Sequence, residues 1–238
     1  MKSSYFRVMV GVLVGLMMAG ALVAFPGCGG ESLPGVEELW DRMQKAKESI
    51  TSMHMEVSFY YQNTKYGSGL TETYVYDFSG QNFKEQHAVF GKTFSEVVVV
   101  GGTMYTKLMN EDKWSQQAPP QGEPDYSQQI AGFARLPEIA TSKENLGLEN
   151  LKGGVEAYHL TFSVDAADLV TLFPKVDSAR LSASTGAKID FWIQKDTDYL
   201  VMYEAVVGNY QFTDPIGFGD LRIVNTMSSI NQPVAINP

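Results

Sequence analysis

Apolar and polar residues alternate after Ser52, and this alternation constrains the fold more than any other feature of the chain. Met53, Met55, Val57 and Phe59 are separated from one another by single, more polar residues, and Tyr61 continues the pattern. Successive side chains of a strand point to opposite faces, so the pattern predicts a strand with one buried face and one solvated face.

Similar segments follow at residues 71–78, 83–90, 94–100 and 103–108, separated by short glycine-containing turns. Tight turns of this kind join antiparallel neighbours, so these segments predict a meander. After a polar loop at 118–124, further strands are predicted at 145–151, 155–164, 187–194, 199–207 and 218–227. We expect one continuous sheet of about 10–11 strands.

Three helices are predicted beside this sheet. Apolar residues recur at intervals of three and four over residues 36–50, including Trp40 and Met43, which predicts an amphipathic helix. Shorter helices are predicted at 128–136, ending before Pro137, and at 166–173, with Asp165 as the N-cap. The fold class is therefore α+β and mainly antiparallel β.

The amino terminus has the layout of a bacterial lipoprotein signal peptide. Lys2 and Arg7 precede an uncharged run over residues 8–25, and Cys28, the one cysteine of the chain, follows at once. We expect residues 1–27 to be removed, Cys28 to be acylated and residues 28–35 to form a tether. The protein would then be lipid-anchored on the extracytoplasmic face of the cell membrane.

A second interpretation of the amino terminus stays open. Phe25 and Pro26 depart from the residues that usually precede a lipidated cysteine, and the uncharged run of 18 residues is long enough for an uncleaved anchor. Both interpretations leave the rest of the chain tethered outside the cytoplasm.

Removing residues 1–27 leaves 211 residues, and we expect residues 36–238 to form one domain. A chain of this length buries enough surface to fold without disulfides. Loss of Lys2 and Arg7 takes the net charge from −9 to −11. This charge disfavours nucleic acid as a partner, because nucleic acid is held through lysine and arginine. We expect a monomer.

Catalytic and metal-binding patterns are missing from the sequence. His54, His87 and His159 are scattered, and no nucleophile elbow, phosphate-binding loop or zinc-binding helix motif occurs. Asp196 and Asp198 fit a hairpin turn better than a calcium loop. The sequence therefore predicts no metal, no cofactor and no enzymatic activity, and a hydrolase would need a polar triad that the sequence does not offer.

The order of elements and three short strings, at residues 158–165, 191–198 and 228–238, resemble the LppX/LprAFG group of bacterial lipoproteins. That group shares the fold of the carrier LolA and of its relative LolB. The resemblance implies a strongly curved half-barrel sheet wrapped around the N-terminal amphipathic helix. It also implies short lid helices at the mouth of a hydrophobic cavity for acyl chains or lipoproteins.

A strongly curved sheet has a concave face wider than its own side chains can fill, so helix 36–50 is expected to occupy part of it. Apolar space that remains can accept an apolar ligand. For each residue taken alone, ordinary core packing is the competing interpretation. The residues expected to line the cavity are Trp40, Met43, Met55, Val57, Phe59, Tyr61, Ile130, Phe133, Tyr158, Leu160, Phe162, Leu169 and Phe173.

These features favour a membrane-anchored lipoprotein that binds lipid or acyl chains, for lipid or lipoprotein transport or for maintenance of the cell envelope. The alternative is an envelope sensor or a scaffold module whose concave face is filled by its own side chains. The size of the cavity distinguishes the two hypotheses.

Overall fold

The computed structural model describes residues 33–118, 133–173 and 176–238. All of these except Leu33 belong to one compact unit, Pro34–Pro238. The predictions for Cys28 and Ile130 concern residues outside the described part of the chain. None of the helices in the described ranges is both long enough and apolar enough to cross a membrane.

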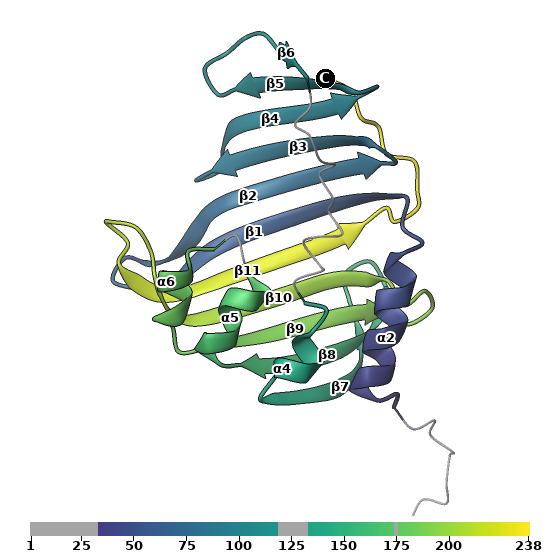
Figure 1. Ribbon diagram of the computed structural model, residues 1–238, viewed down its shortest axis with the longest axis vertical. Coiled ribbons are helices and arrows are strands. Elements are labelled where there is room, and N and C mark those ends of the chain that lie inside the picture. Colours follow the sequence, from purple (N-terminus) through teal and green to yellow (C-terminus); the bar gives the residue numbers. More distant parts are fainter. Residues whose placement is uncertain (1–32, 119–132, 174–175) are drawn as a thin grey trace, which may run out of the picture. The chain divides into compact units, whose positions relative to one another are not determined.

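Eleven antiparallel strands form a single sheet, in the order β6-β5-β4-β3-β2-β1-β11-β10-β9-β8-β7 (Figure 1). This result confirms the predicted α+β fold with one open, curved, mainly antiparallel sheet. The strands are β1 (Ser52–Thr64), β2 (Gly67–Ser79), β3 (Asn82–Val89), β4 (Lys92–Val100), β5 (Thr103–Leu108), β6 (Ser115–Gln117), β7 (Ser142–Asn150), β8 (Glu156–Val164), β9 (Ala187–Gln194), β10 (Leu200–Gln211) and β11 (Phe218–Ser228).

The predicted alternation defines two faces of this sheet. Met53, Met55 and Val57 of β1 are buried on one face, which we call the inner face. Cross-strand partners share a face, so the register carries the inner face from Met55 to Tyr76 on one side and to Met227 on the other. The intervening side chains of β1, such as His54 and Glu56, belong to the outer face.

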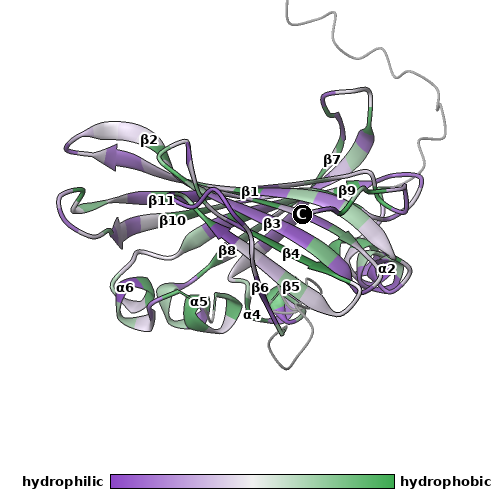
Figure 2. Ribbon diagram, turned by 90° about the horizontal axis from the view of Figure 1, so that it is seen from above, coloured by the Kyte–Doolittle hydropathy of each residue, from purple (hydrophilic) through white to green (hydrophobic). Residues whose placement is uncertain are grey.

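The helices lie on the inner side of the sheet (Figure 2). They cover the half formed by β7–β11 and leave the half formed by β2–β6 without a helix among the described residues (Figure 1). Their bounds are α2 (Val36–Lys47), α4 (Leu136–Ile139), α5 (Ala166–Leu172) and α6 (Ser178–Ser182).

Helix α2 is the predicted amphipathic helix, although it ends at Lys47 rather than near Ile50. Acidic residues in its first turn and Lys45 and Lys47 in its last turn match the helix dipole. Arg42 fixes the helix to the β9–β10 turn, because its guanidinium donates two hydrogen bonds to Asp198, at 3.1 and 2.6 Å. A bidentate pair of this kind sets orientation as well as position.

The helix predicted over residues 128–136 is wrong where the structure describes it. Residues 133–135 form a turn, and α4 begins at Leu136, so that Pro137 lies in its first turn instead of beyond its end. Proline is tolerated there because the N–H groups of the first turn have no acceptor within the helix. Residues 128–132 lie outside the described ranges.

The residues between β1 and β2 were also expected to form a longer turn than they do. Strand β2 begins at Gly67, not near Thr71. Gly69 pairs with Tyr61, and a Cβ atom on Gly69 would lie 2.6 Å from the Tyr61 hydroxyl oxygen. This glycine therefore admits a neighbouring ring within a strand, and its presence does not indicate a turn.

Phe191 on β9 is the centre of the core beneath the helices. It is fully buried, and its ring lies 5.0 Å from that of Trp40, 5.4 Å from Phe133, 5.8 Å from Phe162 and 5.8 Å from Tyr203. The contacts with Trp40, Phe133 and Phe162 are edge-to-face, the arrangement that aromatic quadrupoles favour. One side chain thus joins α2, β8 and β10 in a single cluster.

Replacing Phe191 by alanine should therefore lower the free energy of unfolding by about 3–5 kcal/mol, because it removes a fully buried ring and leaves a cavity. Chemical denaturation monitored by circular dichroism measures this loss. Val206→Ala, on the outer face of neighbouring β10, is the control and should cost about 1 kcal/mol or less. Equal losses for the two variants would contradict the central position of Phe191.

Candidate functional site

Most of the predicted cavity-lining residues lie together against the inner face. Trp40, Met43, Met55, Val57, Phe133, Leu160, Phe162 and Leu169 are buried in one core cluster, and Phe59, Tyr158 and Phe173 are partly buried and pack against it. Tyr61 lies apart from this cluster, and its ring contacts Phe212 at 6.4 Å. The residues of α2, β8 and α5 in this set are ordinary core residues beneath the helices.

Protein side chains fill the space described beside α2. The pocket there has a volume of about 10 Å³ and is lined by Met43, Gln44, Lys47, Ile50, Leu200 and Met227. A volume of this size holds about one water molecule. An acyl chain does not fit at this place.

The inner face continues beyond the helices onto β2–β5. The register places the polar residues Glu85, Ser95 and Thr106 there, and among them apolar and aromatic side chains, which are Tyr74, Tyr76, Phe78, Phe83, Val97, Val99 and Met104. All but Val99 are only partly buried, although Tyr74, Tyr76 and Phe78 pack against the edge of the core. We call this set the open apolar wall. It is the candidate functional site.

A hydrogen-bonded group lies at one edge of the open apolar wall. Tyr74 donates its hydroxyl hydrogen to Glu72 at 2.9 Å, and the same carboxylate oxygen lies 3.2 Å from His87 Nε2. The rings of Tyr74 and His87 are stacked at 4.2 Å. Burial and the hydrogen bond to Glu72 raise the pKa of Tyr74. A polar group of a ligand could therefore form hydrogen bonds beside the apolar side chains of this surface.

The row of cross-strand partners through Tyr74 carries polar groups into the core as well. Tyr74 pairs with Val57, which pairs with Asn225, and Asn225 pairs with Tyr203. Asn225 is 1% exposed and its amide donates to the Met55 sulfur at 3.4 Å, while its Oδ1 atom has no hydrogen-bond partner among the described residues. A buried amide of this kind is uncommon in an apolar core.

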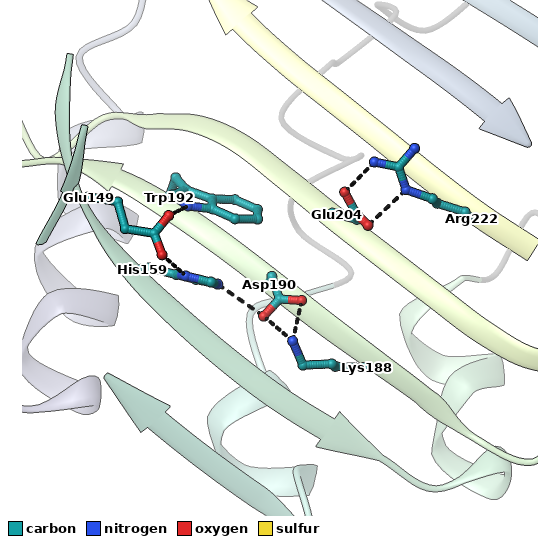
Figure 3. Close-up of polar contacts among 7 residues, drawn as sticks. All are labelled: Glu149, His159, Lys188, Asp190, Trp192, Glu204 and Arg222. Atoms are coloured by element: carbon teal, nitrogen blue, oxygen red, sulfur yellow. Dashed lines mark hydrogen bonds and ion pairs between the residues drawn. The ribbon is translucent and has the colours of Figure 1, made fainter. Parts of the chain in front are cut away.

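The outer face carries a separate polar network on β7, β8 and β9 (Figure 3). His159 lies between two carboxylates, with Nδ1 2.7 Å from Glu149 and Nε2 3.0 Å from Asp190. Trp192 donates its indole N–H to Glu149 at 2.9 Å and stacks on His159, and Lys188 donates to both oxygens of Asp190. This network ties the edge strand β7 to the interior of the sheet.

A second ion pair extends this polar surface across β10 and β11 (Figure 3). Arg222 donates two hydrogen bonds to Glu204, at 2.8 and 2.6 Å, and its guanidinium lies 5.3 Å from the centre of the Tyr60 ring. These contacts lie on the opposite side of the sheet from the open apolar wall. These contacts indicate a structural role, because each joins side chains of neighbouring strands.

Each histidine in the described residues lies beside a carboxylate, since His54 contacts Asp77 at 2.7 Å in addition to the pairs already given. Sequence inspection could not identify these partners, because they come from neighbouring strands separated by tens of residues. Within the described ranges, no group of three or more histidine, cysteine, aspartate or glutamate side chains is arranged so that it could hold a metal ion.

Comparison with known proteins shows which solved structures share this architecture. No family model matches the chain, and no curated protein matches it by sequence. Among solved structures, lipoprotein LppX from Mycobacterium tuberculosis aligns with 19% identity and a TM-score of 0.54, over 85% of this chain and 100% of the LppX chain. LprF from Mycobacterium bovis aligns with 18% identity and a TM-score of 0.53, over 85% of this chain and 95% of that one.

The chain therefore has the fold of the LppX and LprF lipoproteins, as the sequence resemblance predicted. A LolA superfamily protein, NE2245 from Nitrosomonas europaea, aligns more loosely, with 9% identity and a TM-score of 0.28. At these identities the comparison defines the fold and leaves the ligand to be argued from the residues of this chain.

The outer-face network makes stability depend on pH. Hydrogen bonds from Trp192 and His159 lower the pKa of Glu149, and although burial opposes it, hydrogen bonds from Lys188, Thr161 and His159 lower the pKa of Asp190. Lowered carboxylate pKa values stabilise the folded state above the usual carboxylate range, and this contribution is lost as the pH falls through the lowered values.

Glu149→Gln should therefore destabilise the protein most near neutral pH, and the difference from the unsubstituted chain should shrink as the pH falls below the carboxylate range. Denaturation at a series of pH values measures this dependence. Glu144→Gln, at an exposed position of the same edge strand, is the matched control. A deficit for the Glu149 variant that does not change with pH would contradict the assigned network.

Proposed function

We propose that this protein is a membrane-anchored, extracytoplasmic lipoprotein that binds an acyl chain of a lipid on the open apolar wall. The observation that supports the proposal best is the unequal covering of the inner face. Helices cover β7–β11, whereas the described helices leave the apolar side chains of β2–β5 partly exposed (Figure 1). A partly exposed group of apolar and aromatic side chains on one face supports a binding site there.

The energetics of such a site suit reversible binding. Burial of a methylene group contributes about 0.8 kcal/mol, so full enclosure of a long acyl chain would hold it too tightly for ready exchange. An open wall covers one side of the chain and leaves the other side available for exchange. Tyr74, Glu72 and His87 supply hydrogen-bonding groups for an ester or hydroxyl near the head of the lipid.

Two further observations support the location and the class of the protein. The amino-terminal run that ends at Cys28 has the layout of a lipoprotein signal peptide. The solved structures with the same fold are lipoproteins. We propose that the function is carriage or presentation of lipid in the cell envelope and that the protein catalyses no reaction.

One observation favours the alternative of a sensor or scaffold module. The inner face beneath the helices is packed around Phe191, and the pocket beside α2 has room for about one water molecule. A module that needs no ligand would fill its concave face in this way. The two functions differ in what happens on the open apolar wall, so a substitution there distinguishes them.

Phe83→Lys should abolish retention of lipid, because it places a charge between the apolar cross-strand partners Phe78 and Val99 of the open apolar wall. Native mass spectrometry of the full chain purified from a bacterial membrane measures the bound lipid. Val75→Lys is the matched control: Val75 is partly buried on the outer face of β2, where it pairs with Glu56 and Gln86. Lipid bound equally to both variants, or absent from the unsubstituted protein, would contradict acyl-chain binding on this surface.

The proposed anchor predicts a defined mass change. If Cys28 is acylated after cleavage, the mature chain should lack residues 1–27 and carry the mass of its lipid groups. Cys28→Ser should leave the precursor uncleaved and without that added mass. Intact-protein mass spectrometry measures both, and an unmodified, uncleaved chain in the unsubstituted protein would instead support an amino-terminal anchor helix.

A further inference from the structure

Exposed apolar side chains gather at one end of the sheet. Six of those in the described residues, with exposed fractions between 47% and 64%, form a set that we call the hydrophobic rim. Its members are Tyr66, Phe90, Phe94, Leu108, Met109 and Phe218. They come from four different hairpins, so their proximity results from the fold and could not be seen in the sequence.

The topology places these residues at the same end. Alternate turns of an antiparallel meander fall on the same side, which brings together the β1–β2, β3–β4 and β5–β6 turns. The β10–β11 turn joins them, because Gln62 near the end of β1 pairs with Asp220 near the start of β11. All four turns lie at the left end of the sheet in Figure 1.

The opposite end of the sheet has a different character. The turns there join β2 to β3, β4 to β5, β7 to β8 and β9 to β10, and they contain Gly80, Gly101, Gly102, Gly153 and Asp196. None of the residues described in these turns is an exposed large apolar side chain, and within three residues of them only Leu148, near the end of β7, is one. The end with the hydrophobic rim therefore exposes more apolar surface than the opposite end. Hairpin turns in general do not account for this difference, because both ends consist of such turns.

The charges near the hydrophobic rim are balanced, although the chain as a whole carries a net charge of −9. Three lysines and three acids occupy these turns and their first flanking residues, and they are Lys65, Lys92, Lys113, Glu111, Asp112 and Asp214. The ammonium of Lys65 lies 5.0 Å from the centre of the Tyr66 ring. Lysine and tyrosine both place an apolar body below a polar tip, as residues at membrane interfaces do.

We infer that the hydrophobic rim docks on the surface of a lipid bilayer, with its side chains in the interfacial region. Side chains on separate hairpin tips suit a fluid lipid surface, which adapts to each tip, and balanced charge removes the repulsion that the acidic remainder would meet at anionic lipids. The inference rests on the proposed function in one respect, namely that the chain works at a membrane.

Docking in this way would deepen the proposed function, because the rim adjoins the open apolar wall. Phe94 belongs to the rim, and its ring lies 5.5 Å from that of His87, which is stacked on Tyr74. A lipid leaving the bilayer at the rim would therefore reach the wall and its hydrogen-bonding group without crossing the polar end of the sheet.

Fluorescence of the full chain tests the inference, when it is measured with and without vesicles of equal parts phosphatidylcholine and phosphatidylglycerol. A nitrobenzoxadiazole probe on Phe90→Cys should shift its emission to shorter wavelength when vesicles are present and be quenched by nitroxide-labelled lipid. The same probe on Leu146→Cys is the matched control, since Leu146 is an exposed leucine of β7 outside the rim. The unsubstituted chain, treated alike, accounts for any label at Cys28.

A second pair of variants tests whether the rim inserts as a unit. With the probe on Tyr66→Cys, the pair Phe90→Ser and Met109→Ser should lower the inserted fraction about tenfold, and Leu146→Ser with Leu148→Ser should leave it unchanged. Probes at positions 90 and 146 that respond alike would overturn the inference. A blue shift that occurs without vesicles would also overturn it, because the probe would then be contacting protein and not lipid. Either result leaves lipid retention on the open apolar wall, and with it the proposed function, separately measurable.

Discussion

The structure depends on one constraint: a single open sheet has two faces, and the described helices are long enough to cover only half of one of them. Phe191 and Trp40 fix where that cover lies, because their edge-to-face contact joins α2 to the strands at one side of the sheet. The apolar side chains of β2–β5 face the same side but lie beyond the cover. A solid core and an open apolar surface are thus two parts of one continuous face.

The outer face is kept compatible with water in a different way from the inner face. It has no covering helix among the described residues, and many of its polar side chains pair with one another. Glu149, His159 and Asp190 form a chain of hydrogen bonds over which Trp192 lies, and Glu204 and Arg222 pair beside it. Paired charges keep this face compatible with water, so the apolar wall on the inner side is left as the surface that distinguishes the molecule chemically.

The sequence predicted the architecture well, because period-two alternation and amphipathic periodicity are local signals that survive folding. It predicted less of the site. Phe191 stands in an alternating strand like any other apolar residue, and only the crossing of α2 makes it the centre of the core. Helix α6 is too short to show a period, and Pro137 signalled the end of a helix where it in fact belongs to a first turn. The hydrophobic rim could not be predicted, because its residues are brought to one end of the sheet only by the topology of four hairpins.

Photo-cross-linking with a diazirine-bearing fatty acid would show where an acyl chain lies on the folded protein. If the chain binds on the open apolar wall, adducts should form on inner-face residues of β2 and β4, such as Tyr76 and Val97, and unlabelled lipid should suppress them. Adducts confined to the outer face, or to the core residues around Phe191, would contradict binding on this wall.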